Sequence, residues 1–396
     1  MEVDRRPTDD PRERDRVRVL YLLDKAQGGG GAERLALSVL QRLDPARFDR
    51  SICFSRTVGD IPRETLRGSG IDVILLERRS RYDFLPWVKL VQLGRRKRFD
   101  VIHSHKHGSN FWGAVMSTIL RTPVFIAHEH SWSYSGDPFR VLVDRLLIAR
   151  RATRMIAVSD ADRDAMIAVE KIDPARIVVL PNGIPPAEAG DTTPLREELG
   201  LEPAALVVAC VGARPEKRVD ILLRALSRLT DVGPTFQVLV IGESSVERAL
   251  RDLAAELGVA DLVTFLGFRG DVPSLLNLAD IGVISSDREG SPLAILEYMA
   301  AECAIVATGV GGIPNMVEDG EEALLVAPND PEALAGALRR VLDEPDLRTR
   351  LSGAARRRQL RDFSLDDVVA KTAGLYEACL AAVTFDRRPR RIRRPA

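Results

Sequence analysis

One stretch of the sequence combines residue types that suit a phosphate and a sugar held side by side, namely residues 286–297. An apolar, strand-like run precedes a polar turn, and Ser291 followed by Pro292 predicts a helix that starts with Ser291 as its N-cap. The start of a helix presents unpaired N–H groups and a positive dipole end, which bind anions. Glu289 and Glu297 flank this start, and because carboxylates repel phosphate we interpret them as acceptors for sugar hydroxyls. The stretch is a candidate nucleotide-sugar site.

Two cations form a second group with possible chemistry, Arg214 and Lys217. They directly follow the apolar run 206–211, so they are expected at the carboxyl edge of a sheet. There they would neutralise a diphosphate as it leaves; the alternative is ordinary loop charge. The glycine turn at residues 309–314 follows another predicted strand and would let the main chain close on a ligand, although such turns are common.

All five histidines lie between positions 103 and 130. His103 and His105 share one face of a predicted strand, as do His128 and His130 on the next. Two H-x-H pairs are able to bind zinc, but no Cys or Asp at metal spacing joins them. The histidines would otherwise form a structural cluster or line a cleft. We favour the cleft for at least one of them, because strand ends carry function in such folds.

A D-x-D pattern at Asp162 and Asp164 resembles a metal motif of another class of sugar transferases. It lies inside a predicted helix, 160–168, where residues two apart point in different directions. We therefore interpret both aspartates as part of a solvated helix face.

The elements that must position these residues alternate between strands and helices, which predicts parallel, doubly wound sheets. A chain of 396 residues suits two domains of ordinary size. The alternation is interrupted by turn residues and prolines near 182–186, where we expect the domain boundary. A cleft between the two domains is the expected active site. Strands are expected at 17–23, 51–54, 71–76, 101–105, 124–128 and 154–158, and then at 206–211, 236–241, 262–266, 281–284, 304–307 and 324–326.

The composition of the chain bears on its class of partner and on its cellular compartment. The chain has 57 Lys+Arg and 57 Asp+Glu, so its bulk charge gives no argument for nucleic-acid binding. No two of the four cysteines are spaced as a C-x-x-C motif, which indicates reduced thiols in a cytosolic protein. Residues 1–16 are charged and resemble neither a signal peptide nor an anchor, so we expect a disordered lead-in.

Any membrane contact is expected to be peripheral, because no apolar run reaches the length that spans a bilayer. The basic residues 95–98 follow an apolar run, 84–91, and the C-terminal residues 387–394 are strongly basic. Both segments would suit an anionic membrane surface. The alternative is a solvated helix end and a solvated tail.

Several motifs occur in a fixed order, and together they resemble retaining family 4 glycosyltransferases of the GT-B fold over about residues 17–380. The resemblance implies two Rossmann-like domains that face each other across a cleft, with a C-terminal helix that returns to the first domain. The chain departs from the family pattern in a cationic loop one residue shorter than usual, and in Asn315, where many members have Glu. The motifs are GGAE at 30–33, PNG at 181–183, RPEK at 214–217, FLG at 265–267, residues 289–297 and GGIP at 311–314.

The resemblance implies roles for individual residues. Glu289 would contact the donor sugar, Glu297 the ribose, and Arg214 with Lys217 the diphosphate. The family's histidine beside the donor sugar resembles His130, with His128 as second choice. No metal, cofactor or carboxylate nucleophile is implied, since retention is thought to proceed by same-face attack. The expected catalytic set is His130, Glu289, Arg214 and Lys217, and the expected donor-binding set is Gly30, Gly31, Gly267, Phe268, Gly290, Ser291, Pro292, Leu293 and Glu297.

The resemblance predicts a metal-independent enzyme that moves a sugar from a nucleotide diphosphate sugar to an acceptor hydroxyl, in polysaccharide or glycoconjugate assembly. The acceptor would be a glycan, a glycolipid or a small molecule, bound by loops 84–98 and 131–138, where Trp87, Trp132 and Tyr134 would either stack on a sugar or pack internally. The location would be the cytoplasm or the inner face of the membrane. The alternatives are a nucleotide-sugar epimerase of the same fold and a non-catalytic nucleotide-sugar-binding protein. The implied segments are a lead-in at 1–16, an acceptor-side domain at 17–185, a donor domain at 186–364, a crossover helix at 365–385 and a basic tail at 386–396.

Overall fold

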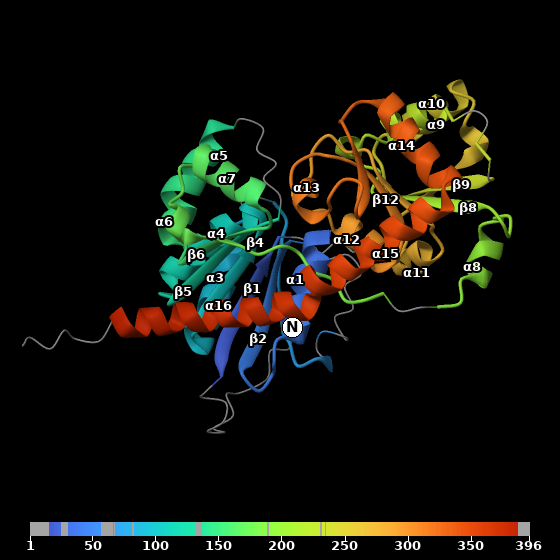
Figure 1. The fold of residues 1–396 in the computed structure, drawn as a ribbon. Helices are drawn as coiled ribbons and strands as arrows, with labels where there is room; N and C mark the ends of the chain where they lie inside the picture. The colour runs from blue at the N-terminus through green and yellow to red at the C-terminus, as the bar shows by residue number, and fades with distance from the viewer. Residues whose placement is uncertain are drawn as a thin grey trace, which may run out of the picture.

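The protein contains two separate parallel sheets, one in each half of the chain (Figure 1). The computed structural model describes residues 16–24, 31–56, 66, 68–80, 83–130, 137–187, 190–229, 232–233 and 235–386. The first sheet has the order β3-β2-β1-β4-β5-β6-β7. Its strands are β1 (Val17–Leu23), β2 (Phe48–Arg56), β3 (Asp72–Arg78), β4 (Val101–His105), β5 (Val124–Glu129), β6 (Arg154–Ala157) and β7 (Ile177–Val179).

Successive side chains of each strand point to opposite faces of the first sheet, so a hydrophobic core lies on each face. In β1, Tyr21 and Leu23 pack on one face, and Leu20 and Leu22 pack on the other. Because both faces are covered, the strands are continuous apolar runs, as expected of a parallel sheet. The helices of this half are α1 (Gly31–Arg42), α3 (Leu85–Lys97), α4 (Lys106–Ile119), α5 (Pro138–Val143), which continues through a π-helical turn, α6 (Ala149–Arg151) and α7 (Asp160–Ala168).

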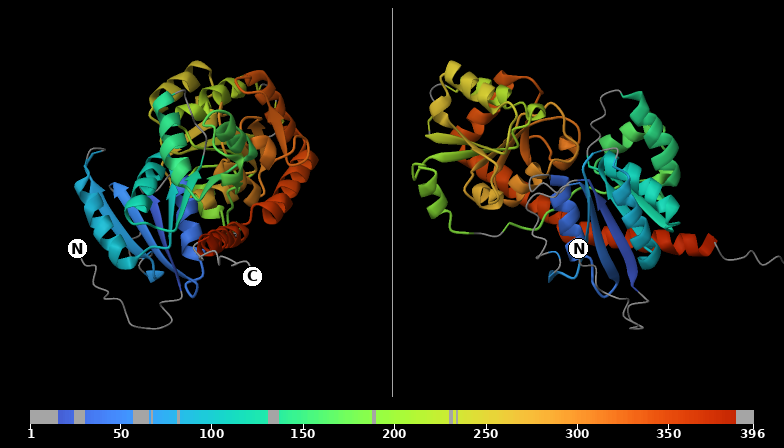
Figure 2. Two further views of the ribbon diagram at one scale, coloured as in Figure 1. Left: turned by 90° about the vertical axis from the view of Figure 1, so that its left-hand side faces the viewer. Right: turned by 180° about the vertical axis from the view of Figure 1, so that it is seen from behind.

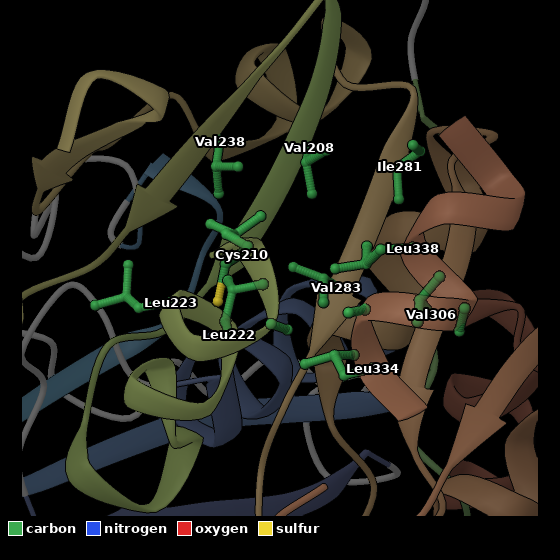
Figure 3. Packing of buried hydrophobic residues seen from close by; sticks show 14 of the residues in the cluster. Val208, Cys210, Leu222, Leu223, Val238, Ile281, Val283, Val306, Leu334 and Leu338 are labelled. Atoms are coloured by element: carbon green, nitrogen blue, oxygen red, sulfur yellow. The ribbon is translucent and has the colours of Figure 1, made fainter. Parts of the chain in front are cut away.

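The second sheet repeats this architecture with the order β10-β9-β8-β11-β12-β13. Val208 and Cys210 of its central strand β8 belong to the core cluster in Figure 3, which Leu222 and Leu338 complete from two covering helices. The strands are β8 (Leu206–Val211), β9 (Phe236–Ile241), β10 (Val263–Gly267), β11 (Ile281–Ile284), β12 (Ala304–Thr308) and β13 (Ala323–Val326). The helices are α8 (Thr193–Glu198), α9 (Val219–Leu226), α10 (Glu247–Glu256), α11 (Val272–Asn277), α12 (Leu293–Ala300), α13 (Ile313–Met316), α14 (Pro331–Asp343) and α15 (Pro345–Asp362).

The last helix, α16 (Leu365–Asp386), leaves the second half and runs along the first sheet (Figures 1 and 2). Its Tyr376 is fully buried, and the Tyr376 hydroxyl donates a hydrogen bond to the hydroxyl of Tyr21 at 2.9 Å. The two connections between the halves pair with each other, since the Ile184 amide donates to the Phe363 carbonyl at 3.1 Å and the Leu365 amide donates to the Ile184 carbonyl at 3.1 Å. We therefore propose that the domains meet at these paired connections, with boundaries at 17–185, 186–364 and 365–385.

Most sequence-based predictions of single elements hold; an unpredicted strand and the burial of Asp162 are exceptions, and the start of α12 is another, described below. The strand β7 was not predicted, because its three residues are only partly buried and lie at a sheet edge. The interpretation of Asp162 as solvent-facing is wrong: Asp162 is buried, and its carboxylate accepts a hydrogen bond from Ser159, the N-cap of α7, at 2.8 Å. The other member of the D-x-D pattern, Asp164, is exposed as expected.

Among the residues that the structure describes, no helix is both long enough and apolar enough to cross a membrane.

Candidate active site

Lys217, expected to contact the diphosphate, and Glu289, expected to contact the donor sugar, form a largely buried ion pair. Lys217 lies in a short turn after β8, and its Nζ is 2.6 Å from Glu289 Oε1, with side chains only 12% and 11% exposed. The Ser286 hydroxyl donates to the same carboxylate oxygen at 2.6 Å. A buried charge is tolerated where it is paired and hydrogen-bonded. The pair therefore holds one cation and one carboxylate in fixed positions at the carboxyl edge of the second sheet.

The glycine turn after β12 supports the loop that carries Glu289. A Cβ atom at Gly311 would lie 1.7 Å from the Glu289 carbonyl oxygen, and one at Gly312 would lie 1.9 Å from that of Gly290. The Gly312 amide donates to the Glu289 carbonyl at 3.2 Å. Gly311 also has φ +56°, which only glycine adopts easily. The close approach that the structure shows is therefore to the main chain of the Glu289 loop, and the expected approach to a ligand stays a prediction.

The helix start beside this loop differs from its prediction. Helix α12 begins at Leu293, and Pro292, with ψ 123°, is its N-cap, so no side chain caps the helix. The expectation that Ser291 is the N-cap is wrong: its hydroxyl contacts the sulfur of Met316 at 3.6 Å. The residue before a proline is disfavoured in helical geometry, and here the extended proline moves the helix start one residue further. The first N–H groups of α12 are left without a side-chain cap.

The other predicted carboxylate, Glu297, lies on α12 and reaches the first half of the chain. Its Oε1 accepts a hydrogen bond from Arg34 Nη2 at 2.8 Å, whereas its Oε2 is buried without a hydrogen-bond partner among the described residues. A second polar link crosses here, because Asn182 Nδ2 donates to the Ser291 carbonyl at 2.7 Å. Sequence analysis assigned no role to Arg34 or Asn182. The only signal was their position, within or next to the motifs at 30–33 and 181–183.

The remaining residues of the predicted catalytic and donor-binding sets have other surroundings. Arg214 does not join the buried pair: its side chain is 68% exposed and its Nε is 3.2 Å from Glu216. Gly267 ends β10 with φ +62°, and the Phe268 ring that follows is 53% exposed. A Cβ at Gly31 would lie 3.0 Å from Leu293 Cδ1, so the start of α1 packs on the start of α12. Gly30 lies outside the described residues.

Four of the histidines form one stacked cluster at the ends of β4 and β5. The rings of His128 and His130 are 4.1 Å apart, and those of His103 and His105 are 4.3 Å apart. His130 Nε2 is 2.9 Å from His105 Nδ1, which leaves its buried Nδ1 without a hydrogen-bond partner in the described part of the chain. We expect this atom to be available to a ligand at the strand end. His128 lies deeper, with its Nδ1 3.3 Å from His103 Nε2.

The cluster does not favour the zinc hypothesis. The ring nitrogens of His103, His105 and His128 lie within 4.8 Å of one another. Both nitrogens of His103 are nevertheless engaged, one by Tyr376 of α16 and the other by His128. A metal would have to displace these contacts. The cluster is better described as a buried polar network that connects α16 to the strand ends.

The structure describes one of the three aromatic residues considered for acceptor binding. Trp87 is buried and stacks on Trp112, with ring centroids 4.2 Å apart, so its role is internal packing. Trp132 and Tyr134 lie outside the described residues. Of the two loops expected to bind the acceptor, the first is not a loop, because residues 85–97 form α3; acceptor binding by either segment stays a prediction.

Acid is expected to destabilise the protein through the histidine cluster. Burial lowers the pKa of His128 from 6.5 to about 3, so between these values the unfolded chain binds more protons and the free energy of unfolding falls as the pH falls. Burial raises the pKa of Glu129 from 4.5 to about 8, so this group acts with the opposite sign. Between about pH 5 and pH 6 each group changes the slope by about 1.4 kcal/mol per pH unit.

The measurement is urea unfolding over this pH range. His128→Asn should reduce the slope of the unfolding free energy against pH by about 1.4 kcal/mol per unit, and Glu129→Gln should increase it by a similar amount. An unchanged slope in the His128 variant would contradict the assignment of a buried, neutral histidine.

Two family models together match most of the chain. Glycosyltransferase Family 4 matches residues 29–188, and Glycosyl transferases group 1 matches residues 191–358. The chain is 33% identical over 301 residues to a D-inositol 3-phosphate glycosyltransferase from Actinosynnema mirum, covering 70% of this chain and 72% of the relative. It is 23% identical over 364 residues to the Escherichia coli UDP-Gal:alpha-D-GlcNAc-diphosphoundecaprenol alpha-1,3-galactosyltransferase, covering 87% and 93%.

Solved structures with the same fold come from similar proteins. Anabaena Alr3699/HepE in complex with UDP and glucose matches with a TM-score of 0.81 at 22% identity, covering 91% of this chain and 100% of that one. WaaG, a glycosyltransferase involved in lipopolysaccharide biosynthesis, matches with a TM-score of 0.71 at 20% identity, covering 90% and 99%. At these identities the likeness establishes the fold, which is the predicted GT-B architecture.

Proposed function

Because this chain belongs to the group 1 and family 4 glycosyltransferases, we propose that the centre around Lys217, Glu289 and Glu297 binds the diphosphate and sugar of its donor. The chain is a glycosyltransferase that uses a nucleotide sugar. The observation that carries the site assignment is the buried Lys217–Glu289 ion pair beside the uncapped start of α12. It fixes a cation for the diphosphate and a carboxylate for the sugar within one hydrogen-bond length of each other.

Each group has a defined task in this proposal. Lys217 and the first N–H groups of α12 stabilise the charge that grows on the leaving diphosphate. Glu289 accepts hydrogen bonds from hydroxyls of the transferred sugar, and the free Oε2 of Glu297 accepts from the ribose. His130, held through its Nε2 by His105, directs its Nδ1 toward the donor sugar.

Transfer is proposed to retain the anomeric configuration and to need no metal. The incoming hydroxyl attacks on the face that the diphosphate leaves, so its proton passes to the leaving phosphate oxygen and no protein nucleophile is needed. Lys217 supplies a positive charge that a divalent ion would otherwise supply. A transferred sugar with inverted configuration, determined by NMR of the product, would refute the retaining mechanism.

Donor binding is expected to raise the melting temperature by a few degrees, because a ligand of the native state stabilises it by about 2.7 kcal/mol at 100 times its dissociation constant. The measurement is thermal unfolding against UDP-, GDP-, ADP- and dTDP-sugars, with and without EDTA. One nucleotide class should stabilise the wild type in EDTA and fail to stabilise Glu297→Ala. The exposed Glu256 of α10 provides the control, Glu256→Ala, which should respond like the wild type.

Stabilisation of the wild type by none of the donors would refute the donor site. Stabilisation that disappears in EDTA would refute metal independence. An effect that persists in Glu297→Ala would remove Glu297 from the site.

We also propose a peripheral membrane contact through α3, where a lipid-linked acceptor would be presented. Phe84, Leu85 and Val88 are exposed at its start, and Arg95 and Arg96 lie in its last turn. An exposed apolar group with basic residues nearby suits an anionic membrane surface. Unchanged liposome binding after Arg95→Gln and Arg96→Gln would refute this contact; the basic tail lies outside the described residues.

A further inference from the structure

The first turn of α1 is tied to both halves of the molecule by adjacent residues. Glu33 Oε1 is 2.6 Å from Lys106 Nζ at the start of α4, which anchors the turn in its own domain. Arg34 Nη2 is 2.8 Å from Glu297 Oε1 on α12, which links the turn to the other domain. The side chains of Arg34 and Glu297 are 41% and 14% exposed. The arginine side chain is thus partly exposed, and the carboxylate is largely buried.

The two oxygens of Glu297 are in different situations. Oε1 accepts from Arg34, whereas Oε2 is buried and has no hydrogen-bond partner among the described residues. A buried acceptor without a hydrogen-bond partner is unfavourable, so a ligand hydroxyl that donates a hydrogen bond to Oε2 would bind more tightly for that contact. A carboxylate can accept on both oxygens at once, so the arginine and a ribose hydroxyl do not compete. One carboxylate can therefore join the first domain to the donor.

Apolar packing accompanies this ion pair at the start of α12. Leu293, the first residue of α12, packs partly against the core of each domain, and Gly31 lies against it. The Asn182 amide adds a second polar link at this helix start. Because the Arg34–Glu297 pair joins the two domains, its loss should shift the population of open and closed molecules.

We propose that Arg34 is a positioning residue that holds the first domain closed over the donor through Glu297. The inference rests on the proposed function, because it takes Glu297 as the group that carries the ribose. In the closed molecule Arg34 also neutralises a carboxylate that would otherwise repel the nearby diphosphate. Donor binding and closure then strengthen each other by the same factor, as linkage requires.

The first test measures the distance between the two domains, both with and without donor. Spin labels on Thr118→Cys in α4 and Arg248→Cys in α10 would report it, since all four native cysteines are buried. Arg34→Met should give a longer and broader distance distribution than the wild type, and Arg34→Lys should restore part of the closed population. The matched control is Arg42→Gln, which removes an arginine of the same helix whose Nε is 3.7 Å from Asp366. Identical distributions for Arg34→Met and the wild type, with and without nucleotide, would overturn the proposal.

Kinetics provide a readout that a purely structural role would not change. With the nucleotide class identified by thermal unfolding, Arg34→Met should still bind by calorimetry, about tenfold more weakly, because the second domain keeps its own contacts. Its kcat at saturating donor should fall by about tenfold or more, while its melting temperature without ligand stays close to that of Arg42→Gln. An unchanged kcat would overturn the role in positioning.

The same experiments distinguish a failure of this inference from a failure of the proposed function. If the wild type bound none of the nucleotides, the donor site would fail, and the role of Arg34 on the donor would fail with it. The ligand-free distances would then show whether Arg34 still acts as a contact between the domains. If the wild type binds and closes but Arg34→Met closes equally well, the donor site stands and only the role of Arg34 is refuted.

Discussion

Lys217→Met is expected to reduce transfer by about a hundredfold or more and to lower stability by about 3 kcal/mol. The first effect follows from loss of the cation that faces the departing diphosphate. The second follows because Glu289, only 11% exposed, would lose the cation that it pairs with. Turnover of the identified donor and urea unfolding measure the two effects separately.

A double variant separates these two effects. Lys217→Met combined with Glu289→Gln removes both charges and should regain most of the lost stability, while transfer stays as low as in the single variant. Wild-type turnover by Lys217→Met would show that the buried pair is structural and that the donor site lies elsewhere.

Gly311→Ala is expected to abolish most transfer by displacing the loop of Glu289. The new Cβ would lie 1.7 Å from a main-chain oxygen, and the backbone φ of +56° is strained for any residue with a side chain. That oxygen is the main-chain carbonyl of Glu289 itself. Either the loop that carries Glu289 or the glycine turn after β12 must therefore move away from the other. We expect a loss of about 3 kcal/mol or more of stability, and a fall in turnover larger than the unfolded fraction explains.

A matched control lies two residues earlier in the same turn. At Gly309 the nearest atom to a new Cβ is 3.8 Å away, which is ordinary van der Waals contact. Gly309→Ala should therefore keep wild-type transfer and stability within about 0.5 kcal/mol. Equal behaviour of the two variants in thermal unfolding and turnover would contradict the close approach at Gly311.

Sequence analysis anticipated those parts of the site that depend on local patterns. An apolar run followed by charged residues places Lys217 at the end of β8, and the same pattern places Glu289 after β11, so their meeting at one sheet edge follows from parallel topology. The histidines were predicted at strand ends for the same reason. The topology of each sheet is a consequence of strand and helix alternation, which the apolar periodicity reveals.

What was missed depends on contacts between distant segments or on competition between local interactions. The Arg34–Glu297 pair joins residues 263 positions apart, and no pattern near either one specifies the other. Ser291 has an N-cap residue type, but the proline after it and the nearby Met316 determine where its hydroxyl points. Asp162 has the composition of a solvated helix face, yet its bond with Ser159 is made in a buried setting.

With the proposed domain boundaries, the paired connections at Ile184 and Phe363 make the second domain an insertion within the first. The chain leaves the first domain after β7 and returns to the same point before α16. Leu365, Tyr376 and Cys379 of α16 belong to the core that covers β1, so this core is incomplete until α16 has been synthesised. During translation the inserted domain can complete its own core first. The domain whose strands are made first is the last to be finished.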